Sequence, residues 1–254
     1  MSTVIITVGN EILTGHIQDT NTRWMAQRLF FLGEDLVRVV IIGDDRDAIS
    51  GLIRENIDGG VDYLFVCGGL GATPDDVTMA AVGDALGRTL VVSDEALEHM
   101  EYLSTFLYER GFITQKMEVN EAIRKMATVL EGSTVLENKA GFCPGMTVTE
   151  RDTRIFVLPG VPQELTTIFT DQIENAYIQP SQNRFMDEIV LSEVEARIAH
   201  IIAKLNEDFP GVSVGSYPTY GAKTLVIRAM GEDEQKVRRV LEEIQSYSDS
   251  LPEL

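Results

Sequence analysis

The first half of the chain alternates short, β-branched apolar runs with amphipathic stretches. The run Val4–Val8 is almost continuously apolar, as is typical of a strand that helices cover on both faces. Similar runs at 37–42 and 63–67 precede stretches with apolar residues at helical spacing. This alternation predicts βαβ units, and therefore an α/β domain built on a parallel sheet.

The same patterns divide the chain into two domains. In the first, we expect helices from Asp19 to Gly33, from Ile49 to Ile57, and over 77–86, 95–111 and 120–129, with a last strand at 154–158. In the second, we expect a strand at 186–191, a helix at 193–206, strands at 212–217 and 224–230, and a helix at 232–247. We therefore predict a larger domain over residues 1–172 and a smaller α+β domain over 173–254.

Charge and composition exclude several classes of protein. The chain has 40 Asp and Glu against 21 Lys and Arg, a formal net charge of −19, which excludes a nucleic-acid binder that acts by neutralising phosphates. No apolar run approaches the length of about 20 residues that spans a membrane. The N-terminus lacks the features of a signal peptide, so we expect a cytoplasmic protein. Cys67 and Cys143 lack zinc spacing and are expected to be buried thiols.

A glycine-rich segment follows the third predicted strand, and ligands of open α/β sheets bind where strands end. It reads Gly68-Gly69-Leu70-Gly71-Ala72-Thr73-Pro74-Asp75-Asp76. Glycines let backbone N–H groups approach a ligand closely, and the N-terminus of the following helix favours phosphate. The alternative is a tight turn in which residues 74–76 only cap the next helix.

Acidic residues follow the ends of all three predicted strands. They are Glu11 after the first, Asp44 and Asp45 after the second, and Asp75 and Asp76 after the third. Carboxylates are hard ligands that select Mg²⁺ or a similar divalent ion, which would also offset the repulsion between this acidic protein and a phosphorylated substrate. The alternative for Asp44 and Asp45 is a solvated turn that caps the next helix.

Several familiar signatures are missing. The chain contains neither a P-loop nor a G-x-S-x-G nucleophile elbow, and Gly9-Asn10-Glu11 does not begin a G-x-G-x-x-G motif. His99 and His200 lie on predicted amphipathic helices, where packing is the expected role.

Five motifs in order resemble one known family. They are Gly9-Asn10-Glu11-Ile12-Leu13-Thr14-Gly15, Asp19-Thr20-Asn21, Gly43-Asp44-Asp45, the glycine-rich segment continuing through Asp76-Val77-Thr78, and Leu158-Pro159-Gly160-Val161-Pro162-Gln163-Glu164-Leu165. Together they resemble the N-terminal region of the competence/damage-inducible CinA proteins, within the wider MoaB/Mog molybdopterin-binding superfamily. The rest of the chain, with Gly215-Ser216-Tyr217-Pro218, resembles the small domain that follows in CinA proteins.

The resemblance implies a three-layer α/β/α domain with a pocket at the glycine-rich turn. Relatives of this domain hydrolyse the pyrophosphate of ADP-ribose-like dinucleotides with a divalent cation, whereas the Mog branch binds molybdopterin and adenylylates it. The resemblance implies that Asp76 and Asp44 occupy the positions at which the superfamily binds metal or carries out catalysis. It also implies self-association, which is usual in this superfamily. Many CinA proteins also carry a nicotinamide-nucleotide deamidase domain, and we do not expect that activity in these 254 residues.

The chain also departs from the family pattern. Ala72 stands where the family usually has proline, and Met79 replaces a commonly polar residue. Asn120, Arg124 and Lys125 roughly match an Asn-x-x-Arg-Lys segment of the family. The alternative is that these residues form a solvent-exposed helix face without a binding role.

We therefore carry a main hypothesis and two alternatives. The first is a metal-dependent nucleotide pyrophosphatase, a hydrolase of ADP-ribose or FAD-like compounds. Its predicted phosphate and substrate site comprises Gly68, Gly69, Leu70, Gly71, Ala72, Thr73, Asn120, Arg124, Lys125, Pro159 and Gly160. Its predicted catalytic residues are Asp76 and Asp44, which would hold Mg²⁺, Mn²⁺ or Co²⁺ together with Asp75 or Glu11.

The first alternative is a protein that binds or adenylylates molybdopterin on the same scaffold. The second is an RNA-binding small domain, which the acidic charge and the absence of a basic Gly-x-x-Gly loop near 193–196 oppose. We expect a phosphorylated small-molecule substrate, a homo-oligomer, and neither nucleic acid nor membrane as a partner.

Overall fold

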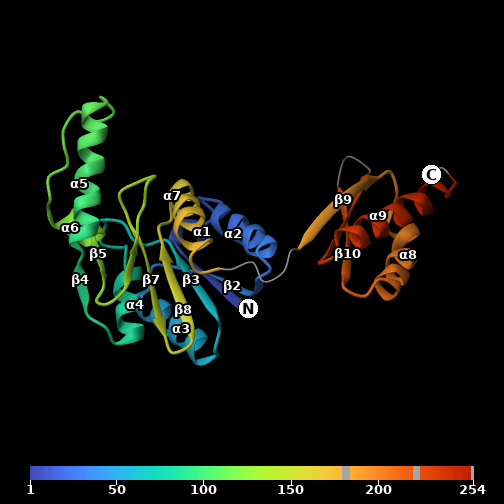
Figure 1. Cartoon of the computed structure of the whole chain (residues 1–254), viewed down its shortest axis with the longest axis horizontal. Helices are drawn as coiled ribbons and strands as arrows, with labels where there is room; N and C mark the ends of the chain where they lie inside the picture. Colours follow the sequence, from blue (N-terminus) through green and yellow to red (C-terminus); the bar gives the residue numbers. More distant parts are fainter. Residues whose placement is uncertain (179–183, 220–223, 253–254) are drawn as a thin grey trace. The chain divides into compact units, whose positions relative to one another are not determined.

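The computed structural model describes residues 1–178, 184–219 and 224–252. These residues form two compact units (Figure 1). The first comprises Met1–Leu29 and Glu34–Gln179, and the second comprises Phe30–Gly33 and Pro180–Leu254.

A six-stranded sheet forms the centre of the first unit. Its strands, in spatial order, are β2 (Asp35–Ile42), β1 (Ser2–Val8), β3 (Tyr63–Cys67), β8 (Thr153–Leu158), β7 (Gly145–Glu150) and β6 (Thr134–Leu136). The pairs among β2, β1, β3 and β8 are parallel, whereas β7 and β6 pair antiparallel. The prediction of a mostly parallel sheet is confirmed, and β6 and β7 are strands that the sequence patterns do not predict.

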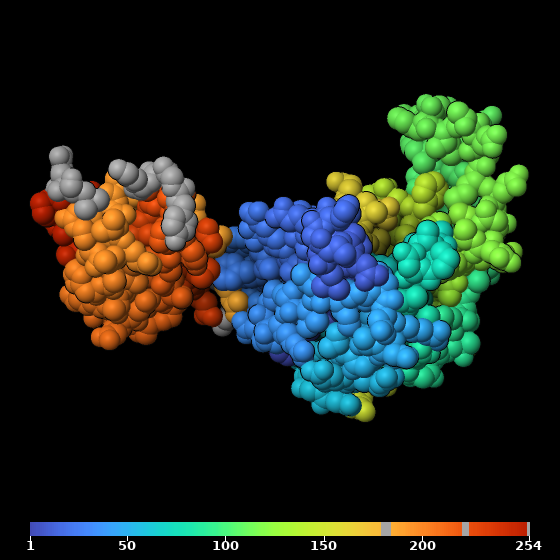
Figure 2. All heavy atoms as spheres, turned by 180° about the vertical axis from the view of Figure 1, so that it is seen from behind, coloured from blue at the N-terminus to red at the C-terminus, as the bar shows by residue number. Residues whose placement is uncertain are grey.

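Helices connect these strands. They are α1 (Asn10–Leu13), α2 (Thr20–Phe31), α3 (Arg46–Asp58), α4 (Thr78–Leu86), α5 (Asp94–Glu109), α6 (Glu121–Met126), α7 (Pro162–Ile168) and the π-helix η1 (Phe169–Ile173). In both space-filling and ribbon views, α5 and the loop that follows it project from the rest of the unit (Figures 1 and 2). Among the described helices, none has the length and apolar composition that crossing a membrane requires.

Apolar residues of the sheet pack against helices on both faces. On one face, Val4 and Ile6 of β1 join Ile49 and Ile53 of α3 in a single buried cluster. On the other face, the ring of Phe65 stacks on Phe156 at 4.8 Å and on Phe169 of η1 at 5.6 Å. The unit is therefore the three-layer α/β/α domain that the family resemblance implies.

The prediction of a helix over 120–129 is wrong for its last residues. Helix α6 ends at Met126, and residues 128–130 instead form β5 (Thr128–Leu130), which pairs antiparallel with β4 (Leu90–Val92). Val129 and Leu130 are buried in this arrangement. The pairing with β4 overrides the helical spacing, because a short apolar segment gains more from burial than from its intrinsic preference.

The first unit extends past the division predicted after residue 172. Phe169, Ile173 and Ile178 are fully buried, and they belong to the first unit. Residues 179–183 of the predicted linker region lie outside the described residues.

The second unit is a small α+β domain with its own core. Its elements are β9 (Phe185–Leu191), α8 (Glu195–Asp208), β10 (Val212–Thr219), β11 (Thr224–Gly231) and α9 (Glu234–Asp249). The sheet is antiparallel in the order β10-β11-β9, and Ile198, Ile227 and Val240 are among its fully buried residues. The predicted βαββα order is therefore present.

Candidate functional site

The glycine-rich turn begins directly at the end of β3. Gly68 and Gly69 have φ values of +96° and +65°, which other residues rarely adopt. A Cβ at Gly68 would lie 2.3 Å from the carbonyl oxygen of Val8, and a Cβ at Gly69 would lie 2.4 Å from Oγ1 of Thr78. Glycine therefore lets the chain turn sharply against β1 and against the start of α4.

The turn exposes a run of free backbone donors. The N–H of Gly68 donates to Leu158 at 3.0 Å, but the N–H groups of residues 69–72 donate to no acceptor among the described residues. The N–H of Thr78 donates to the carbonyl of Gly69 at 3.1 Å, which brings the N-terminus of α4 to the turn. Free N–H groups beside a helix N-terminus form a surface suited to an anion.

A cavity of about 600 Å³ opens beside this turn. Its apolar walls include Ile12, Ile17, Leu70, Met117, Met126, Phe142 and Val161. Its acidic residues are Glu11, Asp19, Asp76 and Glu164, and none of the described lining residues is Lys, Arg or His. A volume in the range of 300–1,000 Å³ with apolar walls and a few polar groups is usual for a small-molecule site.

Two polar residues at the start of α2 line the cavity, and the sequence reasoning did not assign them to the site. Asp19 Oδ1 accepts from the N–H of Thr22 at 2.9 Å, while its buried Oδ2 has no partner among the described residues. Asn21 is only 8% exposed; its Nδ2 donates to the carbonyl of Gly160 at 2.7 Å, and its Oδ1 also lacks a described partner. The available signal was the Asp-Thr-Asn motif of the family pattern, but residues of these types are also typical helix caps.

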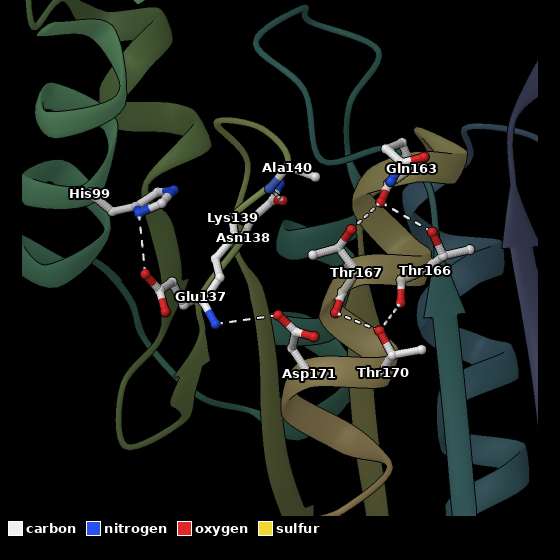
Figure 3. Close-up of polar contacts among 10 residues, drawn as sticks. All are labelled: His99, Glu137, Asn138, Lys139, Ala140, Gln163, Thr166, Thr167, Thr170 and Asp171. Carbon is white, nitrogen blue, oxygen red and sulfur yellow. Dashed lines mark hydrogen bonds and ion pairs between the residues drawn. The ribbon is translucent and has the colours of Figure 1, made fainter. Parts of the chain in front are cut away.

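The loop from Glu137 to Ala140 lies between α5 and α7 (Figure 3). His99 Nδ1 lies 3.8 Å from Glu137, and Lys139 Nζ donates to Asp171 at 3.3 Å. These contacts support the loop that carries Phe142 into the cavity wall. The positioning role of His99 agrees with the packing role expected for it.

Glu164 is the one acidic residue of the predicted proline–glycine segment, and it is partly buried. Asn138 Nδ2 donates to its Oε2 at 2.9 Å, and a Cβ at Gly141 would lie 2.0 Å from its Oε1. Burial raises the pKa of Glu164 above its usual range, and the bond from Asn138 only partly opposes this effect. The cavity therefore contains a carboxyl group that takes up a proton more readily than an exposed one.

Both cysteines line the cavity as unreactive thiols. Burial raises the pKa of Cys143 to about 12 and raises the pKa of Cys67 further. The thiol of Cys143 contacts the carbonyl oxygen of Leu70 at 3.2 Å. Because the thiolate is the reactive form, neither residue is suited to nucleophilic chemistry at neutral pH.

The structure brings many of the predicted site residues together. Those that line the cavity are Glu11, Gly69, Leu70, Gly71, Asp76, Pro159 and Gly160. Ala72, Asn120 and Lys125 line a separate groove of about 560 Å³. Gly68, Asp44, Thr73, Asp75 and Arg124 line neither.

Asp76 closes the turn rather than capping α4. Its Oδ2 accepts from the backbone N–H of Thr73 at 2.9 Å and from the Thr73 hydroxyl at 2.6 Å. Helix α4 begins at Thr78 after Val77, without a side-chain cap. The alternative in which residues 74–76 cap this helix is therefore wrong, because the carboxylate bonds back into the turn.

The acidic residues at the second strand end have local roles. Asp44 Oδ2 accepts from the N–H of Asn10 at 3.1 Å, and Asp45 caps α3 through a bond from Ala48 at 3.0 Å. Among the described residues, no three His, Cys, Asp or Glu side chains lie close enough together to hold a metal ion. A cation held by side chains alone does not fit these residues, whereas one shared with ligand phosphates could use Glu11 and Asp76.

The predicted basic segment lies at the turn but outside the cavity. Asn120 caps α6 by accepting from Ile123 at 3.0 Å, and Lys125 Nζ donates to the carbonyl of Thr73. Arg124 is exposed. Lys125 is therefore the member of this segment that contacts the glycine-rich turn.

These features define an α/β domain with a cavity of small-molecule size at the carboxyl ends of parallel strands. A family model described as "Probable molybdopterin binding domain" matches residues 4–178, and one described as "FAD synthase, middle domain" matches 183–251. The chain belongs to the molybdopterin-binding-domain family.

The relatives include archaeal and bacterial proteins. A protein of Pyrococcus abyssi is 36% identical over 255 residues, covering 100% of this chain and 99% of its own length. A protein of Geobacillus kaustophilus named as competence-damage inducible is 30% identical over 253 residues, covering 97% of this chain and 58% of its own length. The crystal structure of a CinA protein of unknown function from Thermoplasma acidophilum matches with a TM-score of 0.60 and 27% identity, covering 69% of this chain and 98% of that one.

Proposed function

We propose that the first unit binds a phosphorylated pterin of the molybdopterin type in its cavity. The observation that carries this proposal is the run of free N–H groups at residues 69–72, of which residues 69–71 line the cavity next to the N-terminus of α4. Because the described lining residues include no cationic side chain, these backbone donors would bind the phosphate. Membership of a molybdopterin-binding-domain family supports the choice of ligand.

The rest of the cavity suits a flat ring. Met117, Met126 and Phe142 provide apolar and aromatic surface, and the volume of about 600 Å³ accommodates a ligand larger than phosphate alone. The acidic residues and the Asn21 oxygen provide acceptors for ring N–H groups. Phosphate and ring would therefore bind to chemically different walls.

The test compares molybdopterin with a pterin that lacks phosphate. We expect molybdopterin to bind at least about tenfold more tightly, because only it uses the turn donors. Gly69→Ala should remove this advantage, since its Cβ would contact Thr78 and displace the turn. Gly87→Ala is the matched control, because Gly87 also has a positive φ but has nothing within 4 Å of its Cβ position.

Isothermal titration on folded protein measures both affinities. Equal binding with and without phosphate, or no binding of molybdopterin to the wild type, would refute the proposal. Loss of the phosphate advantage in Gly87→Ala as well as in Gly69→Ala would point to general destabilisation instead.

Hydrolysis of a dinucleotide pyrophosphate is the second candidate. Its specific support is that Glu11 and Asp76 line the same cavity as the turn donors, so they could share a divalent cation with phosphate oxygens. Such a cation would stabilise developing charge and lower the pKa of water. The turn would hold the phosphate, and Asp76 would keep its position through its bonds from Thr73.

Release of AMP tests this candidate. ADP-ribose and FAD are each incubated with Mg²⁺, Mn²⁺ or Co²⁺, and with a chelator as control. We expect Asp76→Asn to abolish metal-dependent release, whereas Asp75→Asn should retain it because Asp75 is exposed and does not line the cavity. Absence of AMP release from either compound by the folded wild type would exclude these two substrates.

A further inference from the structure

The start of α2 contains two buried hydrogen-bond acceptors that have no partner among the described residues. Asp19 uses Oδ1 as the acceptor for the N–H of Thr22, and its buried Oδ2 has no partner among the described residues. Asn21 uses Nδ2 as the donor to Gly160, which fixes the amide orientation and leaves Oδ1 as its unpartnered atom. Both residues line the cavity.

Unpartnered acceptors at such a site indicate the chemistry of the ligand. A buried polar atom without a hydrogen bond costs about 1–3 kcal/mol, so a ligand that supplies donors gains affinity there. The described lining residues include no Lys, Arg or His that could supply those donors. The complementary group is therefore an N–H-rich edge and not a second phosphate or a carboxylate.

We propose that Asp19 and Asn21 bind the amino-pyrimidine edge of the ligand ring. A pterin has a 2-amino group beside a ring N–H, so its edge supplies one donor for each of the two unpartnered acceptors. The proposal rests on the proposed pterin-binding function and adds to it which residues select the ring. The free turn donors would bind the phosphate at a separate wall.

The test uses pterin and lumazine as probes. Lumazine has the same fused rings, but a carbonyl oxygen replaces the 2-amino group, so that a donor becomes an acceptor. We expect the wild type to bind pterin at least about tenfold more tightly than lumazine, since a mismatched acceptor pair leaves a buried carboxylate oxygen unsatisfied. Fluorescence titration of each probe, checked by competition against bound molybdopterin, measures the preference.

Asp19→Asn should reverse the preference towards lumazine. In this variant the amide oxygen keeps the position of Oδ1, because it must accept from the N–H of Thr22. The amide nitrogen therefore takes the position of Oδ2, where it offers a donor to the ligand. Asp45→Asn is the matched control. Asp45 caps α3 in the same way, but it is exposed and does not line the cavity, so this variant should keep the wild-type preference.

Each outcome decides the proposal. An equal affinity of the wild type for pterin and lumazine, failure of pterin to bind, or an unchanged preference in Asp19→Asn with a wild-type melting temperature would overturn it. If molybdopterin still binds in those cases, only the role of Asp19 and Asn21 fails. If molybdopterin does not bind to the folded wild type, the proposed function itself fails.

Discussion

Single residues at the end of β3 fix the geometry of the turn. Gly68 and Gly69 both have a positive φ. Gly68 also lies close to the carbonyl of Val8, and Gly69 lies close to the side chain of Thr78. Asp76 then bonds back to Thr73 and closes the turn. The free N–H groups of residues 69–72 depend on these contacts.

Gly68→Ala should therefore destabilise the protein more than Gly87→Ala does. Backbone strain of about 1–3 kcal/mol adds to the clash with Val8 in the first variant. The second variant should lose only about 1–2 kcal/mol, because nothing lies near its added methyl group. Urea denaturation measures both, and equal losses would contradict the role assigned to the Val8 contact.

The buried acid Glu164 makes stability depend on pH. Because burial raises its folded-state pKa above 4.5, the native carboxyl group holds its proton more tightly than the unfolded one. Its contribution to stability is present below pH 4.5 and is lost as pH rises through the folded-state pKa. Glu164→Gln should therefore gain stability relative to the wild type as pH rises.

Free energies of unfolding at pH about 4 and about 8 measure this difference. Glu98→Gln on the exposed side of α5 serves as the control and should show a smaller change with pH. A constant difference between Glu164→Gln and the wild type at both pH values would contradict the prediction.

At the scale of elements, capping side chains mark the start of several helices. Asp45 caps α3, Ser93 caps α5 and Asp233 caps α9, each by accepting from the N–H two or three residues further on. Helix α4 has no such cap, and its first N–H group bonds to the turn instead. Helix α4, at the proposed phosphate site, therefore begins with a backbone bond in place of a side-chain cap.

Asp233→Ala should destabilise the second unit by about 1 kcal/mol, since its carboxylate accepts from Gln235 at 3.0 Å and Lys236 at 3.2 Å. Asp233→Asn keeps these acceptors and should lose less. Far-UV circular dichroism reports both units, whereas the single tryptophan, Trp24, packs edge-on against Phe169 in the first unit. We expect the transition measured by dichroism to shift and the transition measured by Trp24 fluorescence to stay unchanged. An equal shift of both transitions would contradict separate unfolding of the two units.

At the scale of the whole molecule, the chain is strongly acidic and forms two separate hydrophobic cores. The first unit has its core on both faces of the central sheet, and the second has its own cluster between sheet and helices. The net charge of −19 adds repulsion that opposes compaction. Self-association, which the family resemblance implies, stays a prediction.

Salt should therefore stabilise the protein. Raising NaCl from about 20 mM to about 500 mM shortens the screening length and weakens repulsion between the excess carboxylates. We expect the melting temperature measured by calorimetry to rise. KCl should act equally, and an effect limited to one cation or a fall in melting temperature would contradict the explanation.

The sequence by itself determined the elements whose burial pattern is local. The continuous apolar runs of β1 and β3 and the helical spacing of α3 follow from the chain itself, because strand and helix periods are visible within a few residues. The motifs also located Gly69, Gly71 and Asp76 at the cavity. The short β6 is too brief to show a period, so its pairing could not be read in advance.

Only the tertiary structure decided which side-chain atoms remain without partners. Asp19 reads as a helix cap in the sequence, and it is one; its second oxygen and the Asn21 oxygen become unpartnered acceptors only when α2 packs beside the Pro159–Gly160 turn and β3. The same holds for Val129 and Leu130, whose strand forms because β4 lies beside them. Local propensity encodes the period of an element, whereas hydrogen-bond satisfaction and cavity shape depend on segments distant in the sequence.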